Sequence, residues 1–246
     1  MNIRCFSGMG NSAAVATRLA EKLPEGFADV VYVCPVYSWG LPPIIVRHLE
    51  NATDLAGRRV HLVVTCGDDT GNIDRQWQGL LRERGALAGS IYSVQMPNTY
   101  VNLPFMDVDS AAVANEKLAR AAERVDAIAT RLASGIIETD IHRGALPGLK
   151  SSVIYPLFFA DLPRIARKFH STASCTGCGN CVRQCPNGNI TLDSDRRPCW
   201  GNNCTYCLRC YHVCPTHSVA YGRRTSKKGQ YLHPEYQSVI KNFKNF

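Results

Sequence analysis

The sequence predicts an α/β fold with a parallel sheet, followed by a small cysteine-rich α+β domain. Two observations lead to this prediction. Short apolar runs alternate with stretches of helical periodicity from residue 1 to about 134, a pattern typical of parallel α/β sheets. Nine of the twelve cysteines lie between Cys175 and Cys214, and such a cluster without a secretory leader indicates metal ligation rather than disulfides.

Four strands and four helices are expected in the first part of the chain. In the second expected strand, the run Val30–Cys34 is continuously apolar, as a strand covered on both faces should be. In the last helix, apolar residues alternate with charged ones at helical spacing. The expected strands are Ile3–Phe6, Val30–Val36, Val60–Cys66 and Ile91–Met96, and the expected helices are Ser12–Leu23, Pro43–Glu50, Asp74–Arg84 and Ala111–Ala133.

Changes in composition suggest the domain boundaries. We expect a first domain over residues 1–134, a connector over 135–170, a cysteine domain over 171–224 and a polar tail over 225–246. The apolar run Val153–Phe159 of the connector is expected to pack between the two domains; a membrane-surface role is the alternative, because basic residues follow. No stretch of about 18 apolar residues exists, so no transmembrane segment is expected. The missing leader predicts a cytoplasmic location.

Two cysteine runs of identical spacing are the strongest signal in the sequence. Each reads C-x2-C-x2-C-x3-C followed by proline, and the runs end at Cys185-Pro186 and Cys214-Pro215. Three thiolates two residues apart can reach three irons of one cubane, whereas the fourth points away and binds the other cluster. One [4Fe–4S] cluster is therefore expected on Cys175, Cys178, Cys181 and Cys214, and the other on Cys204, Cys207, Cys210 and Cys185.

The remaining cysteines and the alternative metal can be weighed in the same way. Structural zinc uses two separated pairs of ligands, whereas each run here has a third cysteine and a Cys-Pro end. Cys199 falls outside the repeat and is expected to be an inert buried thiol. Cys5, Cys34 and Cys66 lie in or at the ends of strands and are expected to be small buried hydrophobic residues.

A nucleotide site is expected at the carboxyl ends of the predicted strands, where α/β sheets bind ligands. The run 7–12, Ser-Gly-Met-Gly-Asn-Ser, joins the first strand to the first helix, and its glycines, hydroxyls and free amides would cradle a phosphate. The loops after the next two strands offer the flat rings of Tyr37 and Trp39 and the open backbone of Gly67 and Gly71. The alternative is a set of packed loops without a ligand.

Both parts of the chain resemble known families. The two Cys-Pro runs, over residues 175–221, closely resemble bacterial two-cluster ferredoxins. The run 7–12, Pro-Val-Tyr at 35–37 and Trp-Gly-Leu-Pro at 39–42 resemble flavodoxins, and the order of the parts is similar to the flavodoxin/ferredoxin fusion proteins of anaerobes. The resemblance implies one FMN held by Ser7, Gly8, Met9, Gly10, Asn11, Ser12, Pro35, Tyr37, Ser38, Trp39, Gly40, Cys66, Gly67, Gly71 and Asn98.

One departure from the flavodoxin pattern concerns an edge strand. Only residues 24–28 separate the first helix from the second expected strand, too few for the strand and connection that flavodoxins place there. We therefore expect that this strand is missing and that the first strand, with polar Asn2 and Arg4, lies at the sheet edge. The first helix must then cross to a strand on the other side. Left-handed crossovers are rare, and the sequence leaves the hand of this connection open.

These features predict an electron carrier in which FMN and two clusters couple one-electron carriers to two-electron chemistry. Two alternatives stay open: an FMN-dependent reductase of a small molecule, and a ferredoxin whose flavin-free first domain is a docking module. The formal charge of +8 counts cysteines as neutral, and bound clusters and phosphate would offset most of it, so nucleic acid is not an expected partner. Redox proteins are expected partners. Arg196-Arg197 and Arg223-Arg224 are either solvated surface residues or a docking surface for an acidic redox protein.

Overall fold

The computed structural model of the chain describes residues 2–223, 225 and 227–242. The chain forms two compact units, each built from segments that are not adjacent in sequence: Met1–Pro97, Ser110–Pro156 and His233–Phe246 in the first, and Asn98–Asp109 and Leu157–Leu232 in the second. These units cut across the expected connector and tail, so the linear domain boundaries stay a prediction. Within the described ranges, no helix is long and apolar enough to cross a membrane.

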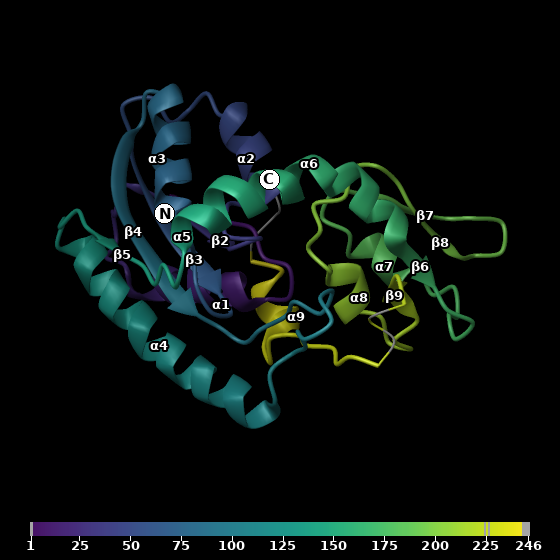
Figure 1. Ribbon diagram of the computed structural model, residues 1–246. Coiled ribbons are helices and arrows are strands. Elements are labelled where there is room, and N and C mark those ends of the chain that lie inside the picture. Colours follow the sequence, from purple (N-terminus) through teal and green to yellow (C-terminus); the bar gives the residue numbers. More distant parts are fainter. Residues whose placement is uncertain (1, 224, 226, 243–246) are drawn as a thin grey trace. The chain divides into compact units, whose positions relative to one another are not determined.

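The first unit contains an all-parallel sheet, which confirms the α/β prediction (Figure 1). Its five strands are hydrogen-bonded in the order β1-β2-β3-β4-β5. Among the described residues, the first strand pairs with the second alone, so it lies at the edge of the sheet as expected. The strands are β1 (Asn2–Cys5), β2 (Val30–Pro35), β3 (Arg59–Cys66), β4 (Leu87–Gln95) and β5 (Thr139–Asp140), and the helices between them are α1 (Asn11–Lys22), α2 (Pro43–Glu50), α3 (Ile73–Glu83) and α4 (Ala111–Ala133).

Helices cover both faces of this sheet (Figure 1). On one face, α1 and α4 pack against Val31 and Val33 of β2. Tyr32 points to the opposite face, where its ring lies 5.3 Å from that of Trp77 in α3 and 5.8 Å from that of His48 in α2. Because the chain nonetheless steps from β1 to β2 to β3 in one direction, the crossovers through α1 and α2 have opposite hands. One of them is therefore of the rare left-handed kind.

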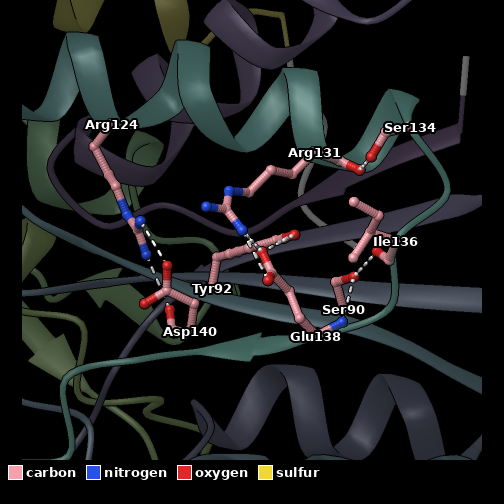
Figure 2. Close-up of polar contacts among 8 residues, drawn as sticks. All are labelled: Ser90, Tyr92, Arg124, Arg131, Ser134, Ile136, Glu138 and Asp140. Carbon is pink, nitrogen blue, oxygen red and sulfur yellow. Dashed lines mark hydrogen bonds and ion pairs between the residues drawn. The ribbon is translucent and has the colours of Figure 1, made fainter.

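Strand β5 was not expected from the sequence, and polar contacts from α4 hold it against β4 (Figure 2). Arg124 donates to Asp140 at 2.8 Å, and Arg131 donates to Glu138 at 2.7 Å. The Tyr92 hydroxyl of β4 donates to the same Glu138 carboxylate at 3.1 Å. These side chains cover an edge of β4 that would otherwise expose unpaired backbone groups.

Two further segments complete the first unit. The short helix α5 (Pro147–Leu149) continues into a π-helical turn, η1 (Lys150–Ile154). The helix α9 (Tyr236–Val239) lies in the stretch expected to be a polar tail, yet Tyr236 and Val239 are buried. Their spacing of three residues is that of one helical face, which explains how so short a segment joins the core.

The second unit is a small α+β structure. Two antiparallel pairs of short strands frame two one-turn helices, and an aromatic core that includes Phe169, Tyr206 and Tyr211 fills the interior. Its elements are most of α6 (Tyr155–Ile165), then η2 (Ala166–Lys168), β6 (Phe169–Ser171), α7 (Asn180–Arg183), β7 (Ile190–Leu192), β8 (Pro198–Trp200), α8 (Arg209–His212) and β9 (Val219–Tyr221). Strand β6 pairs with β9, and β7 pairs with β8.

The loop 98–109 belongs to this second unit although it precedes α4 in sequence. The Asn102 side chain donates to the Tyr206 hydroxyl at 2.6 Å. His212 accepts from the Tyr231 amide at Nδ1 and lies 2.9 Å from the Thr99 carbonyl through Nε2, so Nε2 carries the proton. Burial lowers the pKa of His212 to about 4, which keeps this ring neutral and fixes its two hydrogen bonds.

Candidate metal centres and flavin site

Each cysteine run forms a loop that ends in a one-turn helix, and both loops follow the same backbone path. Three matching positions in each run have left-handed φ angles. In the second run, residues with side chains hold a conformation that costs roughly 1–2 kcal/mol each, and burial of Tyr206 and Leu208 offsets that cost. The matched residues are Gly177, Gly179 and Gly188, at 65°, 72° and 59°, and Tyr206, Leu208 and His217, at 60°, 61° and 51°.

The eight repeated cysteines line two separate cavities. The first three cysteines of each run share a cavity with the last cysteine of the other run. The cavities have nearly equal volumes, about 320 and 340 Å³ with their openings to solvent included, as two copies of one group would need. One, the first site, is lined by Cys175, Cys178, Cys181 and Cys214, and the other, the second site, by Cys204, Cys207, Cys210 and Cys185.

Backbone amides face several of the sulfurs. The Sγ atom of Cys185 accepts from the Asn189 amide at 3.3 Å, and that of Cys214 accepts from the Ser218 amide at 3.2 Å. In the second run, the Tyr206 amide donates to Cys204 at 3.3 Å. Such donors fit a cluster, because they stabilise the additional negative charge that a reduced cluster carries.

The thiols differ in how readily they ionise without metal. Burial raises the pKa of Cys181, Cys207 and Cys210, and that of Cys204 to about 12. Burial acts in the same direction on Cys214, but hydrogen bonds from the Ser218 hydroxyl and nearby amides outweigh it and lower the pKa. Because metal binds the thiolate, loading the raised thiols must release protons.

The described side chains do not form a site for a single ion. Among them, no three His, Cys, Asp or Glu residues converge closely enough to hold one metal ion. A cubane has a different requirement, because each of its four thiolates binds a different iron. The two four-cysteine cavities therefore fit a cluster by their donor set and by the amides that face the sulfurs.

The other four cysteines are not part of these cavities. Cys199, expected to be buried, is instead exposed in β8. Strands β7 and β8 have three residues each, so this hairpin is too short to have both of its faces covered. The sequence pattern alone did not reveal this. Cys5, Cys34 and Cys66 are buried as expected, and burial raises the pKa of Cys34 and brings that of Cys66 to about 12.

In the first unit, the run 7–12 meets the carboxyl ends of neighbouring strands. The hydroxyl of Ser12 lies 2.7 Å from that of Thr65, near the end of β3. Asn11 donates to the Pro97 carbonyl, just beyond β4, at 3.0 Å. The ring of Tyr37, after β2, meets that of Phe6, after β1, at a centroid distance of 6.2 Å. The fold thus brings together loops that are far apart in sequence.

The amino end of α1 has the composition of an anion site. Its N-cap is Gly10, with φ of 98°, and no acidic residue occupies its first turn. Within the part of the chain that the structure describes, no side-chain hydrogen bond caps this end. The hydroxyl groups of Ser7 and Ser12 are buried at this end, and Ser7 accepts from the Gly10 amide at 3.1 Å. Hydroxyls and a helix amino end without carboxylates fit a phosphate monoester.

The loops expected to hold the flavin ring are covered partly by the chain itself. A Cβ at Gly40 would overlap the ring of Tyr155, and one at Gly71 would lie 2.5 Å from the Ser151 hydroxyl. Lys150 lies over the Trp39 ring, 5.1 Å from its centroid. Residues 150–155 therefore occupy the space beside these glycines. Because Lys150 covers one face of the Trp39 ring, a flavin would have to stack on the opposite face.

Several residues of this site were not found from the sequence. Thr65, Ser151 and Tyr155 contact the predicted loops, and His233 donates its backbone amide to the Met9 carbonyl at 2.9 Å. The apolar run that contains Tyr155 was the available signal. Asn98, expected at the flavin, lies in the second unit, where its side chain donates to the Asp107 carbonyl at 2.6 Å.

Comparison with known proteins identifies the class of the C-terminal part. Residues 174–218 match the family model of the 4Fe–4S dicluster domain. No curated protein matches the chain. The chain therefore contains a parallel α/β sheet and a C-terminal segment that matches the 4Fe–4S dicluster domain, and this match supports [4Fe–4S] clusters and iron–sulfur electron transfer.

Proposed function

We propose that the chain is an electron carrier that binds one FMN and two [4Fe–4S] clusters. The pair of four-cysteine cavities within a matched dicluster domain is the observation that supports it most. The amino end of α1, with Gly10 at its N-cap, no acidic residue in its first turn, and buried Ser7 and Ser12, supports the flavin. FMN supplies a centre that takes one or two electrons. None of the described cysteines forms a disulfide, which suits the reducing cytoplasm.

The proposed roles follow the positions of the residues. The run Ser7–Ser12 holds the FMN phosphate, while Tyr37 and Trp39 supply flat surfaces for its ring system. The backbone of Gly67 lies at the end of β3, beside the same edge of the sheet. Each cluster takes the four cysteines that line its cavity, so Cys185 and Cys214 each serve the run to which they do not belong.

A reductive titration tests the coupling of flavin and clusters. We expect the anaerobic protein to accept about four electrons per chain, one for each cluster and two for FMN. Dithionite is added in known amounts while flavin and cluster absorption are followed separately. A titration that ends at about two electrons, with cluster bleaching only, would contradict the flavin part of this proposal and leave the iron–sulfur part intact.

The first site offers a place for an acidic redox partner. Cys178 is exposed. The side chain of Arg183 donates to the Cys178 carbonyl at 2.9 Å, and that of Arg196 donates to the Gly177 carbonyl at 3.0 Å. Two cations are thus fixed around an exposed ligand, and such fixed charge speeds the encounter with an oppositely charged protein.

Neutralising these two cations should slow electron entry from an acidic donor. For Arg183→Gln/Arg196→Gln, we expect a lower second-order rate constant with a reduced acidic ferredoxin, and a weaker dependence of that constant on salt. Stopped-flow spectroscopy at several ionic strengths measures both. Arg47→Gln/Arg75→Gln, two exposed arginines of the first unit, is the charge-matched control. Equal rates and salt slopes in the two variants would refute the docking proposal.

A further inference from the structure

The two cluster sites share one backbone design but differ in the hydrogen bonds to their fourth cysteine. Asn189 and Ser218 stand four residues after Cys185 and Cys214, and each donates its amide to that cysteine's sulfur. The Ser218 hydroxyl makes a second contact with the Cys214 sulfur, also at 3.2 Å. The Asn189 side chain instead accepts from the Asn203 amide at 2.6 Å. Among the described residues, Ser218 therefore adds a side-chain donor at the fourth cysteine of the first site, whereas at the second site the Trp200 indole acts on Cys210 instead.

The charges around the two sites differ in the same direction. Arg183 and Arg196 bind carbonyls of the first loop, and Arg197 donates to the Thr172 carbonyl just before it, at 2.8 Å. Beside the second site, the buried Arg209 donates to the Gln184 carbonyl at 3.1 Å. Arg209 alone would favour electrons at the second site, but three guanidinium groups hold the loop of the first.

Access to solvent adds a third difference. Cys207 and Cys210 of the second site are buried, whereas Cys178 of the first site is exposed. Both cavities are lined by a mixture of polar and apolar side chains. Water beside a cluster stabilises additional negative charge, and burial disfavours it.

We infer that the two clusters have unequal reduction potentials, and that Ser218 helps to set the higher one at the first site. Each cluster takes one electron, from [4Fe–4S]2+ to [4Fe–4S]+, and no bond forms or breaks. Sulfur hydrogen bonds, cations and solvent all favour the more negative, reduced state. At the first site, these are the Ser218 hydroxyl, the three arginines and the exposure of Cys178. This inference rests on the proposed function, because it requires both clusters to be bound.

The unequal potentials assign a resting place to the first electron. A chain that receives one electron holds it at the first site, where Cys178 reaches the surface beside Arg183 and Arg196. The second site fills only with a stronger reductant. Donors of different strength would therefore load the chain with one cluster electron or with two.

A redox titration followed by electron paramagnetic resonance tests this inference. In the unmodified protein, we expect two separate one-electron steps. In Ser218→Ala, the higher step should move to more negative potential, so that the reduced-to-oxidised ratio at a fixed potential falls roughly tenfold, or about 59 mV. Asn189→Ser places a hydroxyl at the matched position, and should raise the lower step and leave the higher one in place.

Iron and sulfide are counted in each variant before the titration, which distinguishes a failure of the proposed function from a failure of this inference. A count well below about eight irons in the unmodified protein would overturn the proposed function itself. With both clusters bound, a single shared step would overturn this inference. So would a shift of the lower rather than the higher step in Ser218→Ala, or no shift in either.

Discussion

Replacing Cys185 and Cys204 together with alanine is expected to leave about four irons per chain, whereas replacing Cys185 and Cys175 together should leave almost none. Cys185 lines the cavity of the second run, so the first pair disables one site and the second pair disables both. Each [4Fe–4S] unit needs its full set of thiolates. Iron and acid-labile sulfide, measured after identical anaerobic reconstitution, give the answer directly.

This comparison is insensitive to a general loss of stability, because both double variants remove two cysteines. Cys199→Ala serves as the control, since this exposed thiol belongs to neither cavity and its loss should leave about eight irons. The reverse pattern, with four irons in Cys185→Ala/Cys175→Ala and none in Cys185→Ala/Cys204→Ala, would show that each run binds its own cluster.

The second large effect is expected at the phosphate end of the flavin site. Ser7→Ala/Ser12→Ala should weaken FMN binding by roughly 100-fold or more, because two hydrogen bonds to a charged phosphate would be lost, each contributing about 1.5–3 kcal/mol. Trp39→Ala should weaken it less, since stacking adds only about 0.5–1.5 kcal/mol beyond area burial. Anaerobic titration of deflavinated protein with FMN measures the dissociation constant of each variant.

The hydroxyl variants are sharper tests than bulky residues at Gly10. With φ of 98° and His233 Cβ only 2.8 Å from its missing Cβ, Gly10 cannot change without displacing the C-terminal segment. Thr65→Val is the matched control, because it removes the hydroxyl partner of Ser12 without touching the proposed phosphate ligands. The phosphate assignment would be refuted by an unchanged FMN affinity in Ser7→Ala/Ser12→Ala, provided that this variant and the unmodified protein both have their full iron content.

Regular elements with a strong local signal were predictable from the sequence. The apolar run of β2 and the helical spacing of α4 gave elements within a residue or so of their observed bounds. The short interval before Val30 also placed β1 at the sheet edge. Each of these inferences needs only nearby residues or a count of chain length, which the sequence contains directly.

Contacts between distant segments were not predictable in this way. The two-residue strand β5 depends on Arg124 and Arg131 reaching across from α4, and no local pattern marks it. The cover of Gly40 by Tyr155 joins residues more than 100 positions apart. Likewise, Asn98 carries no local signal for its place in the second unit. Tertiary packing decides such positions, and one sequence alone does not encode them visibly.

The stoichiometry of bound cofactors tests the central claim most directly. Protein purified without oxygen is analysed for iron, acid-labile sulfide, zinc and flavin per chain. The proposal predicts about eight irons, about eight sulfides and about one FMN, because each [4Fe–4S] cluster contributes four of each inorganic atom. Zinc without labile sulfide, found again after anaerobic reconstitution with iron and sulfide, would contradict it.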